Sequence, residues 1–184
     1  LSESLPKTID YKMSYYPNLF YFGTGGYSCF SNICHKALMS GPALSQDVYD
    51  DFYEQRVKPC LEDTKYKEDN VRSIESSIPD DFIFVALQVE NDTVMTRKFV
   101  ETNEMLKRAA EAAEKMGIAL VVKIHPKTKD DHPSRKYIKL QAEKYDHIYT
   151  SIADIRLLLD RARGVCVINS GVGFEALCRL KHVY

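Results

Sequence analysis

The chain has 184 residues, of which 45% are hydrophobic and 28% charged, and its formal net charge is −1. This composition is ordinary for a globular protein with one cored domain, or one domain and an appendage. A net charge near zero argues against a nucleic-acid-binding protein, so we expect no nucleic acid among its partners. The sequence contains no apolar run of membrane-spanning length and no signal-peptide pattern.

The first 80 residues predict an N-terminal segment followed by a connector. Residues 15–22 have a strand pattern, a Gly-rich loop follows at 23–28, and residues 31–39 have the pattern of a short helix. Residues 42–80 are polar and charge-dense, apart from a helical pattern at 48–61. We therefore expect residues 1–80 to be a short part that leads into the main domain.

Residues 81–184 alternate between strand and helix patterns, and this alternation predicts an α/β fold with a doubly wound, parallel, Rossmann-type sheet. In the first helix Phe99 and Leu106 are expected to face the core and Gly117 to end it, and Ser151 is expected to cap the third helix. The last strand pattern begins where the sequence stops, so we expect the sheet to be truncated. The predicted strands are 82–87, 118–124, 147–149, 165–168 and 182–184, and the predicted helices are 94–116, 133–145, 151–163 and 172–180.

Five irregularly spaced cysteines predict reduced thiols and a cytoplasmic protein, rather than a disulfide or zinc framework. The histidines also lack the spacing of metal ligands, so we expect no metal site.

Polar residues follow the strand at 82–87. Gln88, Glu90 and Asp92 occupy alternate positions, so in an extended segment they point the same way. Two close carboxylates and an amide suit acid/base or nucleophilic chemistry, because close carboxylates can split their pKa values. A helix cap formed by Asp92 or Thr93 explains the same residues equally well.

A second polar loop follows the strand at 118–124. Pro126 ends the strand, and Lys123 and His125 alternate to the same side. The lysine offers a point charge and the histidine a hydrogen-bond donor, which together suit a phosphate. The alternative is a solvated basic loop. The strand-end position favours the phosphate hypothesis, since open α/β sheets bind ligands there.

The strongest pattern is Asn169-Ser170-Gly171-Val172-Gly173 at the start of the last helix. Gly171 and Gly173 permit close backbone approach, and Ser170 can cap the helix and donate to an anion attracted by the helix N-terminus. Glu175, one turn further on, can reach ribose hydroxyls. The alternative is a plain strand–turn–helix with Glu175 in a capping box, and for Glu175 alone this structural explanation is favoured.

Taken together, the three loops resemble the capsular polysaccharide synthesis family of retaining β-Kdo transferases. The resemblance covers roughly residues 81–184. It implies a GT-B-like fold in which residues 81–184 form the Rossmann-type donor domain and residues 1–80 a short or incomplete acceptor-side part. The motifs that carry it are Gln88-Val89-Glu90-Asn91-Asp92, Lys123-Ile124-His125-Pro126 and Asn169-Ser170-Gly171-Val172-Gly173-Phe174-Glu175-Ala176-Leu177.

The resemblance also implies an activity. It implies transfer of Kdo from CMP-Kdo to a bacterial surface glycan, of capsule-linker or O-antigen type, with retention. His125 is then expected to contact the CMP phosphate together with Ser170 and the Gly171 amide, Asp92 to act as nucleophile and Glu90 as helper or acid/base. CMP-Kdo is a substrate, so no cofactor is expected. The implied partners are this nucleotide sugar and a glycan or glycolipid acceptor, at the cytoplasmic face of the inner membrane, with peripheral association through the assembly machinery.

Two other functions fit the same loops. A sialyltransferase-like enzyme or a nucleotide-sugar epimerase would use the same fold with different chemistry. A non-catalytic nucleotide-binding module would explain the short first part.

Overall fold

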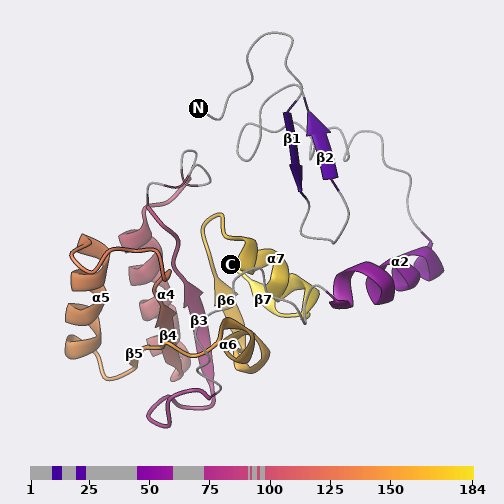
Figure 1. Cartoon of the computed structure of the whole chain (residues 1–184). Helices are drawn as coiled ribbons and strands as arrows, with labels where there is room; N and C mark the ends of the chain where they lie inside the picture. The colour runs from indigo at the N-terminus through magenta and orange to yellow at the C-terminus, as the bar shows by residue number, and fades with distance from the viewer. Residues whose placement is uncertain are drawn as a thin grey trace. The chain divides into compact units, whose positions relative to one another are not determined.

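The computed structural model describes residues 10–13, 20–23, 45–59, 73–90, 92, 95 and 98–184. The chain divides into two compact units, Leu1–Lys65 and Tyr66–Tyr184. Figure 1 draws the first in indigo and violet and the second in magenta through yellow. The predicted boundary lies instead after residue 80, and the assignment of the two parts to acceptor and donor stays a prediction.

The first unit contains a small antiparallel pair and a helix. Strands β1 (Asp10–Met13) and β2 (Phe20–Gly23) pair in antiparallel register, with Asp10 opposite Gly23. Helix α2 (Gln46–Phe52) passes into a π-helical turn, η2 (Tyr53–Val57), and together they overlap the predicted helix at 48–61 but begin two residues earlier. The predicted Gly-rich loop after residue 23 and the predicted helix at 31–39 lie outside the described residues.

The second unit is built on a five-stranded sheet in which every strand runs parallel to its neighbours. The strand order is β5-β4-β3-β6-β7, so the first strand of the unit lies at the centre (Figure 1). All five residues of β3 are buried, as expected for a strand covered on both faces. The bounds are β3 (Phe82–Ala86), β4 (Ala119–Lys123), β5 (Ile148–Thr150), β6 (Gly164–Cys166) and β7 (His182–Val183).

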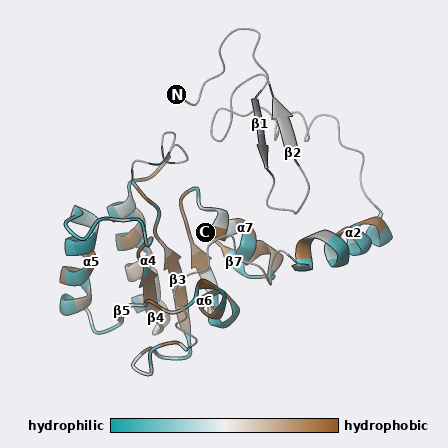
Figure 2. Cartoon of the chain, viewed as in Figure 1, coloured by the Kyte–Doolittle hydropathy of each residue, from teal (hydrophilic) through white to brown (hydrophobic). Residues whose placement is uncertain are grey.

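Helices cover both faces of this sheet. Alternate β3 residues face opposite ways: Phe84 packs with α6 (Ile155–Arg161) and α7 (Gly171–Cys178). Val85 packs with α4 (Thr102–Met116) and α5 (Pro133–Lys144) on the other face. Figure 2 shows the apolar colour concentrated on the strands and the polar colour on the outer helix surfaces. The predicted α/β, doubly wound parallel fold is therefore confirmed.

Helix α4 shows both a correct prediction and a wrong one. Leu106, Ala109 and Ala113 form its buried stripe, and Gly117 ends it in the left-handed conformation with φ 65°. The predicted start at residue 94 is wrong, because the backbone before Thr102 is extended at Glu101. Phe99 consequently lies outside the helix and is fully exposed, so its predicted place in the core is wrong as well.

The predicted cap of helix α6 is also wrong. The helix begins at Ile155, and the Asp154 carboxylate accepts a hydrogen bond from the Arg156 amide at 2.8 Å. Ser151 is instead bonded to Glu75, which comes from the segment before β3. Helix α5 agrees with its prediction, since Pro133 occupies its first turn.

The segment before β3 belongs to the sheet domain and not to a connector. Ile78 is buried in the core on the α6–α7 face, and Ile74 packs against the same core. Glu75 lies between these two residues. This segment therefore reaches the sheet before the first strand begins.

Candidate functional site

The three predicted loops lie on one rim of the sheet. Strands β4 and β6 flank β3 in parallel, so the loops that follow them emerge at the same edge (Figure 1). Adjacent strands lie about 4.8 Å apart, which places the ends of β4 and β6 roughly 10 Å from each other. After β3 the next strands are added on one side, as β4 and β5, and the later ones on the other side, as β6 and β7. Open α/β sheets bind ligands at such a switch point in the strand order.

The loop between β6 and α7 is held by a helix cap and by close packing. Ser170 is the N-cap, and its hydroxyl accepts a hydrogen bond from the Val172 amide at 3.3 Å. This hydroxyl can also donate its own hydrogen to an anion. A Cβ at Gly173 would lie 2.8 Å from Cγ2 of Val167, so this glycine allows α7 to pack closely on the chain leaving β6.

The β3 loop and the β6 loop are joined directly. The side-chain oxygen Oε1 of Gln88 accepts a hydrogen bond from the backbone amide of Asn169 at 2.9 Å. These two residues are 81 positions apart in the sequence. The side chain of Gln88, which was predicted to be catalytic, therefore holds the backbone that leads into the N-terminus of α7. Asn169 itself is exposed.

Glu90 is braced by groups of the segment leading into α4. Its carboxylate accepts a hydrogen bond from Lys98 Nζ at 3.4 Å, and Lys98 also pairs with Glu101 at 2.6 Å. Burial disfavours the charged form, but the hydrogen bond from Thr102 and the charges of Lys98 and His132 outweigh it and lower the pKa of Glu90. Glu90 is thus a carboxylate at neutral pH, which suits a base or an electrostatic role and not a proton donor.

Asp92 is exposed and lies in a short turn after Glu90. Its amide donates to the Val89 carbonyl, and its carbonyl accepts from the Met95 amide. Asn91, within the same predicted motif, lies outside the described residues. Asp92 thus stands on the same rim as the other two loops.

Lys123 and His125 follow β4 but have different surroundings. Only 7% of Lys123 is exposed, and its Nζ donates to the carbonyl oxygens of Ala153 at 2.8 Å and Ile152 at 3.2 Å. The His125 ring accepts a hydrogen bond at Nδ1 from the Lys127 amide at 3.1 Å, so the neutral ring carries its proton on Nε2. Pro126 follows in an exposed turn that the Thr128 amide closes onto the His125 carbonyl.

Glu175 lies further along α7 than a capping box allows. With Ser170 as N-cap, the third helical position is Gly173, and a capping box needs a Glu or Gln there. The capping-box explanation for Glu175 is therefore wrong, because this residue lies two positions too far along the helix. Its predicted contact with ribose hydroxyls stays a prediction.

Two residues that hold this rim were missed in the sequence. Glu75 accepts hydrogen bonds from the Ser151 hydroxyl at 2.6 Å and the Ile152 amide at 2.8 Å. Arg135 donates from Nη2 to the Thr128 carbonyl at 2.9 Å and from Nε to the Lys129 carbonyl at 3.2 Å. The local sequence pattern predicts neither residue, because each contact depends on the folded path of the chain.

One of the two described cysteines, Cys166, is unsuited to act as a nucleophile. Neither Cys166 nor Cys178 is part of a disulfide bond. Burial raises the pKa of Cys166 to about 11, so this thiol stays protonated at neutral pH. Cys29, Cys34 and Cys60 lie outside the described residues.

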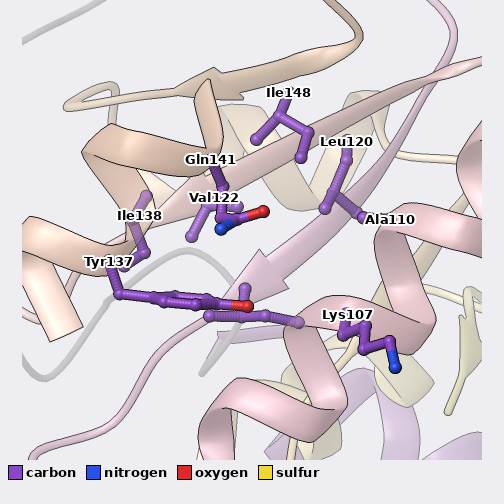
Figure 3. Close-up of a pocket in the computed structure, with 9 residues that line it drawn as sticks. Lys107, Ala110, Leu120, Val122, Tyr137, Ile138, Gln141 and Ile148 are labelled. Atoms are coloured by element: carbon purple, nitrogen blue, oxygen red, sulfur yellow. The ribbon is translucent and has the colours of Figure 1, made fainter. Parts of the chain in front are cut away.

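A small cavity lies away from the rim, between α4 and α5 over the sheet. Figure 3 shows the side chain of Gln141 lying over Val122 of the sheet and the ring of Tyr137 extending from α5 toward α4, which carries Lys107. Its volume of about 20 Å³ suits one water molecule and is far too small for a nucleotide sugar. The cavity therefore does not compete with the rim as the candidate site.

In the part of the chain that the structure describes, no three His, Cys, Asp or Glu side chains gather in a way that would hold a metal ion. None of the helices in those same ranges combines the length and apolar character that a bilayer crossing needs.

A comparison with protein families matches residues 40–184 to the family described as capsule polysaccharide biosynthesis protein. The match covers more than half of the chain. The chain belongs to this capsule family. The predicted resemblance to capsule synthesis proteins is thereby confirmed, and the match begins well before residue 81. A comparison with curated proteins finds no match. Membership in the capsule family indicates a role in capsule polysaccharide biosynthesis.

Proposed function

We propose that this capsule family protein is a glycosyltransferase that moves Kdo from CMP-Kdo to a bacterial surface glycan, with retention of configuration. The observation that supports it best is the gathering of three polar loops on one rim around β3, with Gln88 bonded to the Asn169 amide. A rim at a switch point suits a nucleotide. The sequence resemblance supplies the choice of sugar.

The leaving group of this reaction is CMP, whose phosphate gains negative charge as the glycosidic bond breaks. In the proposal the Nε2–H of His125 donates to this phosphate from one side of β3. The Ser170 hydroxyl and the N-terminus of α7 stabilise it from the other side. Donors that are already in place stabilise developing charge most effectively.

The carboxylates of the β3 loop supply the chemistry. The Asp92 carboxylate attacks the anomeric carbon, the bond to CMP breaks, and CMP leaves with the electron pair. An acceptor hydroxyl then displaces Asp92 and loses its proton, which restores the original configuration. The lowered pKa keeps Glu90 ionised, so in the proposal it stabilises positive charge on the sugar or accepts the proton as a weak base, and does not act as an acid.

The proposal includes the remaining predicted contacts and the setting. Pro126 shapes the turn after His125, and Glu175 binds the ribose. CMP-Kdo is the donor substrate and needs no cofactor. The acceptor is a capsule-linker or O-antigen glycan or glycolipid, met at the cytoplasmic face of the inner membrane through association with the assembly machinery.

The test is CMP release from CMP-Kdo by the intact protein, with a surface glycolipid extract as acceptor. We expect His125→Ala to lower turnover by about 100-fold or more, because one preorganised donor is lost. The exposed His182 on β7 provides a matched control, since His182→Ala leaves the rim intact. Unchanged turnover in His125→Ala would reject the phosphate contact.

Three further measurements test the nucleophile and the alternative functions. Mass spectrometry of the trapped glycosyl–enzyme should place the sugar on Asp92, and a different attachment site rejects that assignment. Turnover of CMP-sialic acid in place of CMP-Kdo would favour the sialyltransferase-like enzyme. CMP binding without turnover of any donor would favour the non-catalytic module.

A further inference from the structure

A connected set of buried and half-buried polar groups lies beside the candidate site. The Glu75 carboxylate accepts hydrogen bonds from the Ser151 hydroxyl at 2.6 Å and the Ile152 amide at 2.8 Å. Lys123 Nζ donates to the carbonyls of Ile152 and Ala153 in the same loop. We name these contacts of Glu75 and Lys123 with residues 151–153 the rim clamp.

The hydrogen-bond partners in the rim clamp compensate for the hydration that its polar groups lose on burial. A buried ammonium is unfavourable unless nearby groups compensate for its lost hydration. Lys123 is 7% exposed and receives two carbonyl contacts. Burial disfavours the charged form of Glu75, but the hydrogen bonds from Ser151 and Ile152, with the charge of Lys123, lower its pKa. Glu75 is therefore a carboxylate at neutral pH, and both side chains bind the backbone of one loop.

The rim clamp is attached to the strand that carries His125. Lys123 is the last residue of β4, two positions before His125. The Ser151 amide donates to the Val122 carbonyl and so continues the β4–β5 pairing to this point. The Ser151 hydroxyl, besides bonding Glu75, accepts from the Ala153 amide at 3.1 Å. These hydrogen bonds join the clamp directly to the end of β4.

We propose that Glu75 and Lys123 are positioning residues of the donor site, which hold the β5–α6 loop against the end of β4 and thereby fix the place of His125. This inference rests on the proposed function. It gives Lys123 a different task from the predicted one, since the lysine acts on phosphate through His125 and not by direct contact.

Opposite charge changes distinguish the two roles of Lys123. Lys123→Met removes a positive charge near the phosphate and Glu75→Gln removes a negative one. If Lys123 contacts the phosphate, the first change weakens CMP binding and the second strengthens it. If both residues position His125, both changes weaken CMP binding. Ser151→Ala changes no charge and weakens CMP binding only in the positioning case.

The experiment measures the affinity of the intact protein for CMP and for cytidine by calorimetry. We expect Lys123→Met, Glu75→Gln and Ser151→Ala each to weaken CMP binding by about tenfold, as small displacements of a binding group do. Cytidine has no phosphate, so its affinity should be unchanged. The Lys123→Met/Glu75→Gln double variant should lose no more CMP affinity than the weaker-binding single variant, because both residues act through the same set of contacts. Lys129→Met, which removes an exposed lysine from the β4–α5 loop, is the matched control.

Three outcomes overturn the inference. Tighter CMP binding by Glu75→Gln makes Lys123 a direct ligand. Unchanged CMP affinity in Glu75→Gln and Ser151→Ala makes the clamp merely structural, and equal losses for CMP and cytidine indicate general damage. If Lys123→Met does not fold, the other two variants still decide.

Failure of the proposed function would look different. The wild-type protein would then not bind CMP, and the role of the clamp in donor binding would fall with it. Hydrogen exchange at the Ile152 amide would still accelerate in Glu75→Gln, because its bond to the Glu75 carboxylate is present regardless of the ligand.

Discussion

The two loops proposed to hold the phosphate are built by different means, although both follow parallel strands next to β3. The β6–α7 loop is shaped by backbone geometry: a serine cap, and a glycine that lets the helix approach Val167. The β4–α5 loop is shaped by charged and polar side chains, since Arg135 holds the Thr128 and Lys129 carbonyls and His125 accepts from a backbone amide. The first should respond to changes of volume and the second to changes of charge or hydrogen bonding.

The largest expected effect tests the packing of the β6–α7 loop. Alanine at position 173 gains about 1 kcal/mol of helix propensity over glycine. Its Cβ would lie 2.8 Å from the stiff side chain of Val167, and such overpacking typically costs about 1–3 kcal/mol. We expect Gly173→Ala to lower the free energy of unfolding in urea by up to about 2 kcal/mol, which is the overpacking cost less the gain in helix propensity. Adding Val167→Ala should recover part of this loss; no recovery would mean that the contact with Val167 is not the cause.

The next effect concerns the β4–α5 loop. Arg135→Met leaves the carbonyl of the buried Thr128 without its guanidinium partner. Because hydrogen bonds from charged groups contribute about 1.5–3 kcal/mol and Arg135 is partly exposed, we expect a loss near the lower limit. Arg108→Met removes an arginine from an exposed pair with Glu104 and should have little effect in the same urea titration. Equal losses in both variants would contradict the role given to Arg135.

A smaller effect separates the two tasks of Ser170. Ser170→Ala should cost about 1 kcal/mol of stability, whereas Ser170→Gly should cost only a few tenths, because glycine is a good N-cap. Both variants lack the hydroxyl and should lose CMP affinity equally. If affinity instead follows stability, Ser170 acts only as a cap.

The smallest effect concerns the β3–α4 loop between these two. The folded pKa of Glu90 is lowered from its ordinary value of 4.5, so its charged form stabilises the fold above that pH. This contribution is lost as the pH falls below 4.5 through the folded pKa. On acidification the unfolding free energy of the Glu90→Gln variant should therefore fall less than that of the wild type. The difference should be smaller than the free energy of an exposed ion pair. Identical acid profiles would remove Glu90 from this account.

The fold followed from the sequence wherever the signal was local. Apolar runs located β3 and β4, Gly117 marked the end of α4, and Pro133 the start of α5. The rim position of the three loops also followed, because parallel strands share one direction. The start of α4 was missed because the helical pattern includes Phe99, which lies outside the helix and is exposed.

The candidate site was less predictable than the fold. Ser170 as a cap was read from residue type alone, and the structure confirms it. The bond from the Asn169 amide to Gln88 and the contacts of Glu75 with Ser151 join residues 81 and 76 positions apart. Pattern and spacing carry no information about such distant pairs.

The central position of β3 also determines at what stage of synthesis the rim can form. This strand is made first within its unit, yet one of its two long edges stays bare until Gly164–Cys166 has been synthesised. A chain leaving the ribosome therefore holds an uncovered strand edge over the whole interval, and such edges invite pairing with other chains. Nascent chains cut short before residue 164 are accordingly expected to aggregate, with the rim still incomplete.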